Sequence, residues 1–178
     1  MAAQLFNSAG YHQTSMDDIA EKMGLAKPTL YHYYAGKAQI LAAIHEEFIV
    51  AMAERFHQRQ SLGLGPNDQL REVMVDILEF IAERRGHVKV FYEHQQDLPP
   101  ESRAHITRLR TEFTGKVSQL ITECTDRGEF REVDATMAAR ALLGTCNWSI
   151  HWFRPSRGTD ARDTAVFMHA MLTQGLRA

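Results

Sequence analysis

The chain of 178 residues is long enough for one domain, or for a small domain joined to a larger one. Its hydrophobic share of 44% and charged share of 24% are those of a folded globular protein and exclude a disordered chain. A formal net charge of −2 provides no general attraction to nucleic acid, so any such function must come from a local surface.

The two cysteines and the distribution of apolar residues set further limits. Cys124 and Cys146 are far apart and lack the C-x-x-C spacing, which favours neither a disulfide framework nor a zinc knuckle. The sequence has no run of about 18 apolar residues and does not open with a charged and then apolar leader. We therefore expect a reduced, cytoplasmic protein without membrane association.

The spacing of apolar residues is helical along most of the chain. Ile40, Ile44 and Phe48 recur at intervals typical of one helix face, whereas the alternation typical of strands is scarce. This pattern predicts an all-α fold. We expect helices over residues 2–9, 16–23, 27–33, 37–60, 68–84, 87–97, 100–127, 134–153 and 160–176.

The predicted helices fall into two groups by length. Those within residues 1–45 are short and joined by tight turns, whereas those within residues 46–178 are long. Because short helices bury little apolar surface by themselves, the long helix that begins at Lys37 is expected to join the two groups. We predict a small N-terminal domain over residues 1–45 and a larger one over residues 46–178.

The N-terminal part contains a helix-turn-helix pattern. Ser15 and Asp18 match a capping box at the start of the helix over residues 16–23. A turn that begins with Gly24 separates this helix from a second short one over residues 27–33. In a helix-turn-helix unit the second helix enters the major groove of DNA.

The side chains around the second helix divide into two sets. We expect Leu25, Leu30 and Tyr31 to pack between the helices. Hydroxyl groups and lysines on the outward face suit phosphate contacts, a proline ring or threonine methyl suits thymine, and a helix start attracts phosphate. The predicted DNA contacts are Thr14, Ser15, Lys27, Pro28, Thr29, His32, Tyr33 and Lys37. For His32 the alternative is a side chain that faces only solvent.

This pattern resembles the DNA-binding signature of the TetR family of bacterial transcriptional regulators. The matching stretch is TSMDDIAEKMGLAKPTLYHYYAGKAQIL, and the preceding LFNSAGYHQT fits the end of that family's first helix and its glycine turn. The resemblance implies a homodimer whose two DNA-binding domains bind a palindromic operator in double-stranded DNA. It further implies a repressor that a small-molecule effector, bound in the C-terminal domain, releases from DNA.

The N-terminal charge departs from the family's pattern. Over residues 1–55 the acidic residues outnumber the basic ones by six to four. Related regulators carry arginine and lysine before the first helix, where they reach phosphates. We expect that a basic segment before Met1 is missing here, since phosphate neutralisation supplies much of the free energy of DNA binding.

The last two predicted helices, over residues 134–153 and 160–176, are apolar on more than one face. Such helices need a partner beyond their own domain. In TetR-like regulators the corresponding pair forms a four-helix interface with its twofold mate. Both arguments predict a homodimer.

Residues 145–155 are rich in aromatic and polar side chains. On a helix Asn147 and His151 share one face, and Trp148 and Trp152 form a neighbouring stripe. Apolar walls with a few polar groups suit a ligand pocket. The alternative is that the tryptophans pack at the dimer interface and that His151 lies inside the core.

A second candidate pocket wall lies around residues 87–97, with arginines before and after it. An apolar tunnel that ends near arginines suits a ligand with an apolar tail and an anionic head. Alternatively each arginine lies on a solvated face and pairs with glutamates. The candidate ligand contacts from both walls are Arg84, Phe91, Tyr92, His94, Gln95, Arg110, Phe113, Asn147, Trp148 and His151.

The C-terminal N-W-x-x-x-W-F-R-P stretch resembles the TetR-like branch that senses acyl-CoA thioesters. This resemblance implies an acyl-CoA effector. A free fatty acid, an aromatic compound or a cationic drug are the alternatives, because ligand specificity varies widely among proteins of one fold.

An enzyme or a helical interaction module are the rival classes. The sequence lacks H-E-x-x-H, a repeated E-x-x-H pair and a glycine-rich phosphate loop. His87 and His94 share a helix face, but the sequence identifies no further metal ligands near them. We therefore expect no catalysis, no cofactor and no metal.

Overall fold

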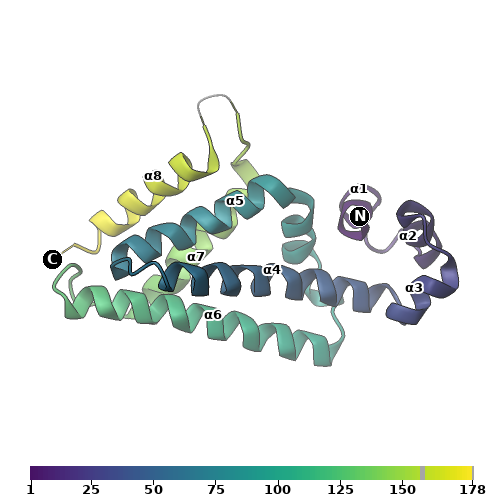
Figure 1. Cartoon of the computed structure of the whole chain (residues 1–178), viewed down its shortest axis with the longest axis horizontal. Coiled ribbons are helices and arrows are strands. Elements are labelled where there is room, and N and C mark those ends of the chain that lie inside the picture. Colours follow the sequence, from purple (N-terminus) through teal and green to yellow (C-terminus); the bar gives the residue numbers. More distant parts are fainter. Residues whose placement is uncertain (157–158, 178) are drawn as a thin grey trace. The chain divides into compact units, whose positions relative to one another are not determined.

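The computed structural model describes residues 1–156 and 159–177. Over these ranges it contains α-helices and one short 3-10 helix, η1, so the predicted all-α fold is confirmed (Figure 1). The elements are α1 (Ala2–Ala9), α2 (Met16–Met23), α3 (Lys27–Tyr33), α4 (Lys37–Gln60), α5 (Pro66–Glu93), η1 (Gln95–Asp97), α6 (Pro100–Asp126), α7 (Ala135–Trp152) and α8 (Ala161–Gln174). None of the described helices is both long and apolar enough to cross a bilayer.

Local chemistry sets the boundaries of α2. Ser15 Oγ accepts a hydrogen bond from Asp18 N (3.1 Å), and Asp18 Oδ2 accepts one from Ser15 N (2.7 Å), which completes the predicted capping box. The bonds that the Asp18 carboxylate accepts from Ser15 N and from Ser15 Oγ (2.7 Å each) lower the pKa of Asp18. At the other end Gly24 adopts a left-handed conformation with φ 65°, which a side chain would disfavour.

Helix α5 differs from the prediction of separate helices over residues 68–84 and 87–97. The structure has one helix from Pro66 to Glu93 with a kink at Arg84, where φ is −129° and ψ is 40°. The helix resumes at once after this residue, and the short η1 follows it. The predicted interruption is thus a bend within one helix rather than a loop.

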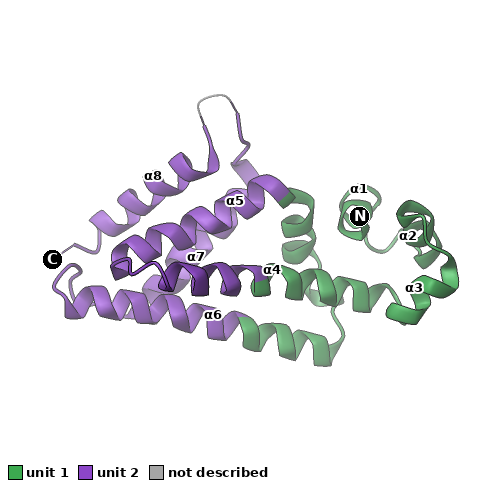
Figure 2. Ribbon diagram, in the orientation of Figure 1, with its two compact units in different colours: residues 1–50, 84–109 green, residues 51–83, 110–178 purple. Residues whose placement is uncertain are grey.

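The chain forms two compact units built from non-contiguous segments (Figure 2). Unit 1 comprises Met1–Val50 and Arg84–Leu109, and unit 2 comprises Ala51–Glu83 and Arg110–Ala178. Helices α4, α5 and α6 each contribute to both units. The segment that follows the kink in α5 therefore belongs to the unit that contains α1, α2 and α3.

In unit 1 the three short helices pack in series, α1 on α2 and α2 on α3. Phe6, Ile19 and Leu30 are each no more than 1% exposed and form the apolar centre of this part. The ring of Tyr11 meets Phe6 edge-on, with 5.0 Å between ring centroids. Burial of each such side chain stabilises the folded state by about 1.5–3 kcal/mol. This compensates for the small apolar area that short helices bury.

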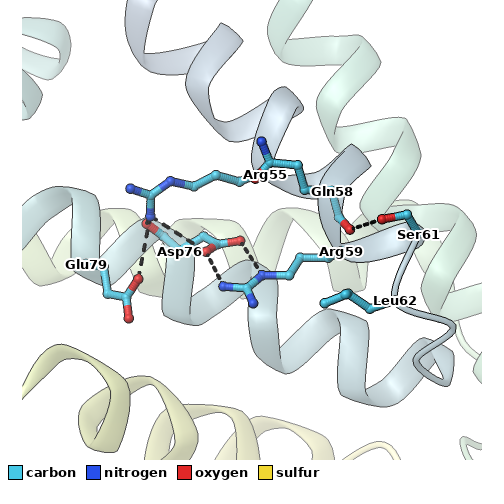
Figure 3. Close-up of a pocket in the computed structure, with 7 residues that line it drawn as sticks. All are labelled: Arg55, Gln58, Arg59, Ser61, Leu62, Asp76 and Glu79. Atoms are coloured by element: carbon cyan, nitrogen blue, oxygen red, sulfur yellow. Dashed lines mark hydrogen bonds and ion pairs between the residues drawn. The ribbon is translucent and has the colours of Figure 1, made fainter.

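In unit 2 the first part of α5 is buried on nearly all sides and carries two buried carboxylates, Glu72 and Asp76. Arg59 from α4 donates to Asp76 Oδ1 (2.9 Å), and Arg162 from α8 donates to Glu72 Oε1 (2.8 Å). Arg55, Arg59 and Asp76 of this network line an open surface pocket of about 460 Å³ (Figure 3). A buried carboxylate is tolerated when it is paired, so this network fixes α4 and α8 against α5.

Candidate DNA-binding surface and effector residues

Helix α3 presents most of its side chains to solvent. Leu30 is 1% exposed, whereas Lys27, Thr29 and His32 are all exposed and Tyr33 is 71% exposed. The rings of His32 and Tyr33 meet edge-on, with 5.2 Å between ring centroids. An exposed helix of this composition offers hydroxyl and imidazole groups at a surface, as direct contact with DNA requires.

The packing expected for Leu25 and Tyr31 is wrong. Leu25 is 37% exposed and Tyr31 is 44% exposed, so neither fills the angle between α2 and α3. The reason is the length of α3. A helix of about two turns directs few side chains inward, and in α3 the buried residue is Leu30. Tyr31 consequently joins the outward face, and the sequence analysis missed it as a candidate DNA contact.

Thr14 is buried in unit 1, and the half-buried Lys37 directs its ammonium group to the loop between α1 and α2. Thr14 is 2% exposed, and its hydroxyl donates to the carbonyl oxygen of Gly10 (2.7 Å). Lys37 Nζ donates to the carbonyl oxygens of Tyr11 (2.8 Å), His12 (2.9 Å) and Thr14 (3.2 Å). These bonds use all three donors of the ammonium group. The placement disagrees with the predicted phosphate contacts and makes both residues supports of the loop between α1 and α2.

Two other predicted contacts lie at the surface but already have partners. Ser15 caps α2, and Lys27 Nζ donates to Asp17 Oδ2 (2.8 Å). The bond to Asp17 raises the pKa of Lys27. Both groups are exposed, so a phosphate can compete for Lys27 in water.

The predicted effector contacts are divided between the two units. Arg84, Phe91, Tyr92, His94 and Gln95 belong to unit 1. The contacts that belong to unit 2 are Arg110, Phe113, Asn147, Trp148 and His151.

Phe91 is the centre of an aromatic cluster in unit 1. It is 2% exposed, and its ring centroid lies 4.8 Å from those of His45 and Phe48 and 4.9 Å from that of Tyr92. Phe113, in unit 2, is half-buried and faces Phe56 with 6.2 Å between ring centroids. Aromatic walls of this kind suit the apolar part of a ligand.

An acidic residue of α4 links that helix to the kink in α5. Glu47 accepts hydrogen bonds from Arg84 and from His87 Nε2, the latter at 2.9 Å. Burial lowers the pKa of His87 despite the adjacent carboxylate. Glu47 and His87 also line a cavity of about 220 Å³ within unit 1, which is smaller than most ligand pockets. The sequence analysis did not identify Glu47, because nothing in its local sequence points to a partner forty residues away.

Trp148 and His151, predicted as ligand contacts, lie at the surface of the single chain. Trp148 is 65% exposed, and His151 is also exposed, with 4.3 Å between the two ring centroids. They lie opposite the face of α7 that contains Leu142, Cys146 and Ile150, which is buried. Spacing showed that these residues share a region of the helix, but not which side faces the core. The alternative of a buried His151 is wrong.

Several large apolar side chains of α7 and of α8 are exposed. They are Met137, Trp148, Trp152, Val166, Phe167 and Met171, each at least 40% exposed. Where such side chains lie next to one another, they mark protein–protein interaction sites. We call this set the α7/α8 surface.

Two family models match the chain. The model of bacterial regulatory proteins of the tetR family covers residues 1–44. The model of the tetracyclin repressor-like C-terminal domain covers residues 63–176. The chain belongs to the TetR family.

Individual TetR-family proteins resemble this chain along nearly its whole length. The HTH-type transcriptional repressor KstR2 of Rhodococcus jostii is 24% identical over 178 residues, which are 99% of this chain and 87% of that protein. The crystal structure of PfmR from Thermus thermophilus has a TM-score of 0.88 at 30% identity and covers 99% of this chain and 97% of its own. AibR in complex with isovaleryl coenzyme A and operator DNA has a TM-score of 0.84 at 27% identity, with 97% and 94% covered.

Membership of the TetR family gives the α2–α3 unit its function, which is DNA binding in a transcriptional regulator. The position of the α2–α3 unit depends on the loop between α1 and α2, to which Lys37 is hydrogen-bonded. Replacing Lys37 with methionine keeps the length of the stem but removes three charge-assisted hydrogen bonds.

We expect Lys37→Met to lower the free energy of unfolding by about 2–4 kcal/mol, because three carbonyl groups lose a charged partner. Urea denaturation followed by circular dichroism measures the change. Lys22→Met, an exposed substitution on α2, is the matched control and should stay within about 0.5 kcal/mol of the parent. Equal stability of the two variants would show that the loop does not depend on Lys37.

Proposed function

We propose that this TetR-family regulator binds a palindromic operator as a homodimer in the cytoplasm and leaves it when a small effector binds. The exposed face of α3 is the observation that carries the DNA-binding part. Of the predicted contacts, Thr29, His32 and Tyr33 remain accessible there, with Lys27 and Pro28 beside them. The unexpected exposure of Tyr31 adds a further hydroxyl group.

Tyr33 is the sharpest probe of this surface because it is the most exposed large side chain of α3. We expect Tyr33→Ala to weaken binding about tenfold, or ~1.4 kcal/mol, since both the ring and the hydroxyl contact are lost. Fluorescence anisotropy with a duplex selected from random sequences gives the dissociation constant. Tyr33→Phe separates the hydroxyl contribution from that of the ring.

His57→Ala, on the exposed part of α4 that belongs to unit 2, serves as the control for general surface changes. It should bind the same duplex as the parent does. If Tyr33→Ala also matches the parent, Tyr33 is not a DNA contact.

The homodimer rests on the α7/α8 surface. Side chains such as Trp148 and Phe167 are each 65% exposed in one chain, and burying them against a second copy removes apolar area from water. This supports the alternative in which the tryptophans pack at the dimer interface. It also explains why α7 and α8 are apolar on more than one face.

We expect Phe167→Glu to convert the dimer into monomers, because a carboxylate would be buried in the interface on both sides. Sedimentation velocity measures the mass in solution. Leu62→Glu alters a residue that is 61% exposed outside the α7/α8 surface and should leave the dimer intact. A dimer that survives Phe167→Glu would place the interface elsewhere.

For the effector we propose an acyl-CoA thioester. The aromatic cluster around Phe91 offers an apolar wall, and Arg84, which belongs to the same unit, offers a guanidinium group suited to phosphates. AibR, the similar protein captured with isovaleryl coenzyme A and operator DNA, supports this class. The rival is an aromatic or cationic compound. The response would pass from the kinked part of α5 to α4 through Glu47, since both lie in unit 1 with α3.

Thermal unfolding with acyl-CoAs, free fatty acids and CoA alone tests the effector class. A ligand of the native state stabilises it by ~2.7 kcal/mol at one hundred times its dissociation constant. We expect a shift of the midpoint that needs both the acyl chain and CoA. The same compound should release the duplex in the anisotropy assay. A shift with an aromatic or cationic compound but with no acyl-CoA would favour the rival.

A further inference from the structure

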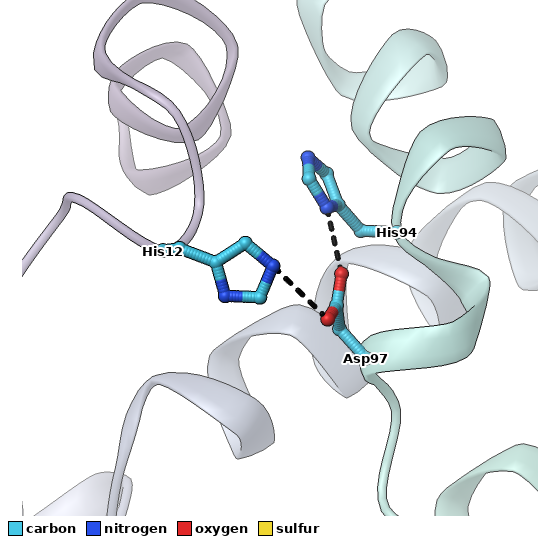
Figure 4. A group of neighbouring side chains, drawn as sticks. All are labelled: His12, His94 and Asp97. Atoms are coloured by element: carbon cyan, nitrogen blue, oxygen red, sulfur yellow. Dashed lines mark hydrogen bonds and ion pairs between the residues drawn. The ribbon is translucent and has the colours of Figure 1, made fainter.

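Three side chains that bind metals well converge in unit 1 (Figure 4). His12 lies in the loop between α1 and α2, His94 directly follows α5, and Asp97 ends η1. His12 Nε2 is 3.3 Å from Asp97 Oδ1, and His94 Nδ1 is 2.8 Å from Asp97 Oδ2. One potential ligand atom from each residue lies within 4.8 Å of the others.

The identity of these groups selects a class of ion. Two imidazole nitrogens and one carboxylate oxygen form a ligand set that zinc and its first-row neighbours prefer, whereas magnesium and calcium prefer oxygen ligands. The sequence analysis considered His94 together with His87. In the structure His87 pairs with Glu47 instead, and the loop between α1 and α2 supplies His12 as the second histidine.

The distances already approach those of a coordinated ion. With bonds of about 2.0–2.1 Å, the ligand atoms of a tetrahedral zinc site lie roughly 3.3 Å apart. The distance from His12 Nε2 to Asp97 Oδ1 (3.3 Å) equals this value, and the distance from His94 Nδ1 to the other carboxylate oxygen, Oδ2 (2.8 Å), would lengthen by about 0.5 Å. The ligand nitrogens of the two imidazoles lie within 4.8 Å of each other, and the His12 side chain, which is 68% exposed, has room to move toward His94. The same exposure leaves water access to a fourth position.

The backbone that carries His12 is held from the other side. Lys37 donates to the carbonyl oxygen of His12, and its ammonium group lies 4.7 Å from the ring centroid of Tyr11. The Tyr11 ring in turn lies 5.3 Å from that of His94. A ligand set fixed in this way loses less conformational entropy when it binds an ion.

We propose that His12, His94 and Asp97 bind one zinc-class divalent ion, with water completing its coordination. The ion would join the loop between α1 and α2 to the C-terminal end of α5. It would therefore restrain the DNA-binding helices relative to the segment that contains several predicted effector contacts, including His94 itself. This site is separate from the predicted contacts with DNA.

Titration of the chelator-treated dimer with Zn²⁺, against a chromophoric chelator of known affinity, tests the proposal. We expect one ion per chain. His12→Asn and Asp97→Asn should each weaken binding by at least about tenfold, since each removes a ligand from the ion. Co²⁺ in place of Zn²⁺ should give the visible absorption of a four-coordinate site in the parent and not in His12→Asn.

His57→Asn and His151→Asn are the controls, because both remove exposed histidines outside the cluster. They should keep the affinity of the parent. The two cysteines should not compete, since both are buried and burial raises the pKa of each thiol to about 12.

Circular dichroism confirms that each variant is folded. His12→Asn changes an exposed loop residue and keeps the test informative if a change at Asp97 unfolds the chain. Binding of less than one ion per chain, or an affinity that His12→Asn leaves unchanged, would overturn the proposal. In that case the three residues form only a hydrogen-bonded triad.

Discussion

The three hydrogen bonds from Lys37 to the loop between α1 and α2 are the constraint on which the DNA-binding helices depend. Short helices cannot bury enough apolar surface to fix their own arrangement. An ammonium group that satisfies the carbonyls of Tyr11, His12 and Thr14 closes the loop against the first turn of α4. The start of α2, with Ser15 as its cap, follows directly from that loop. Lys37, which the sequence suggests as a DNA contact, thus uses its hydrogen-bond donors to hold the DNA-binding unit in place.

The kink at Arg84 marks where the second segment of unit 1 begins. The first part of α5 is buried in unit 2, where its carboxylates pair with arginines. Beyond the kink the same helix meets α4 through Glu47 and carries the aromatic cluster around Phe91. One continuous helix therefore takes part in both units. In the proposed function this continuity gives a ligand near Phe91 a direct mechanical connection to α4.

The sequence predicted those features that depend on neighbouring residues. The bounds of α1 to α4 follow from caps, glycines and apolar spacing, all of which act within a few residues. The interruption near Arg84 was detected, but local signals do not tell whether a helix resumes in line or after a loop. Pairing over long sequence distances, as between Glu47 and His87, leaves no local signal.

The candidate site shows the same limit. A lysine and a threonine beside a helix-turn-helix pattern look alike whether they face DNA or their own backbone, and Thr14 and Lys37 face the backbone. On α7, spacing placed Trp148 and His151 near each other without revealing which face is buried. A helix that is apolar on more than one face carries only a weak periodicity to decide this, so tertiary packing is needed to separate a pocket from an interface.

The small number of lysines in the DNA-binding unit relates its proposed contacts with DNA to the proposed dimer interface. Residues 1–50 contain three lysines and no arginine. Lys37 is committed to the loop, and Lys27 must leave Asp17 before it contacts a phosphate. Within residues 1–50, Lys22 and Lys27 are the lysines left for contacts with phosphates. In the proposed homodimer two such units are linked, so the second binds at a high effective concentration once the first is bound. In that proposal the α7/α8 surface, remote in sequence from α3, contributes to DNA binding by linking two DNA-binding units.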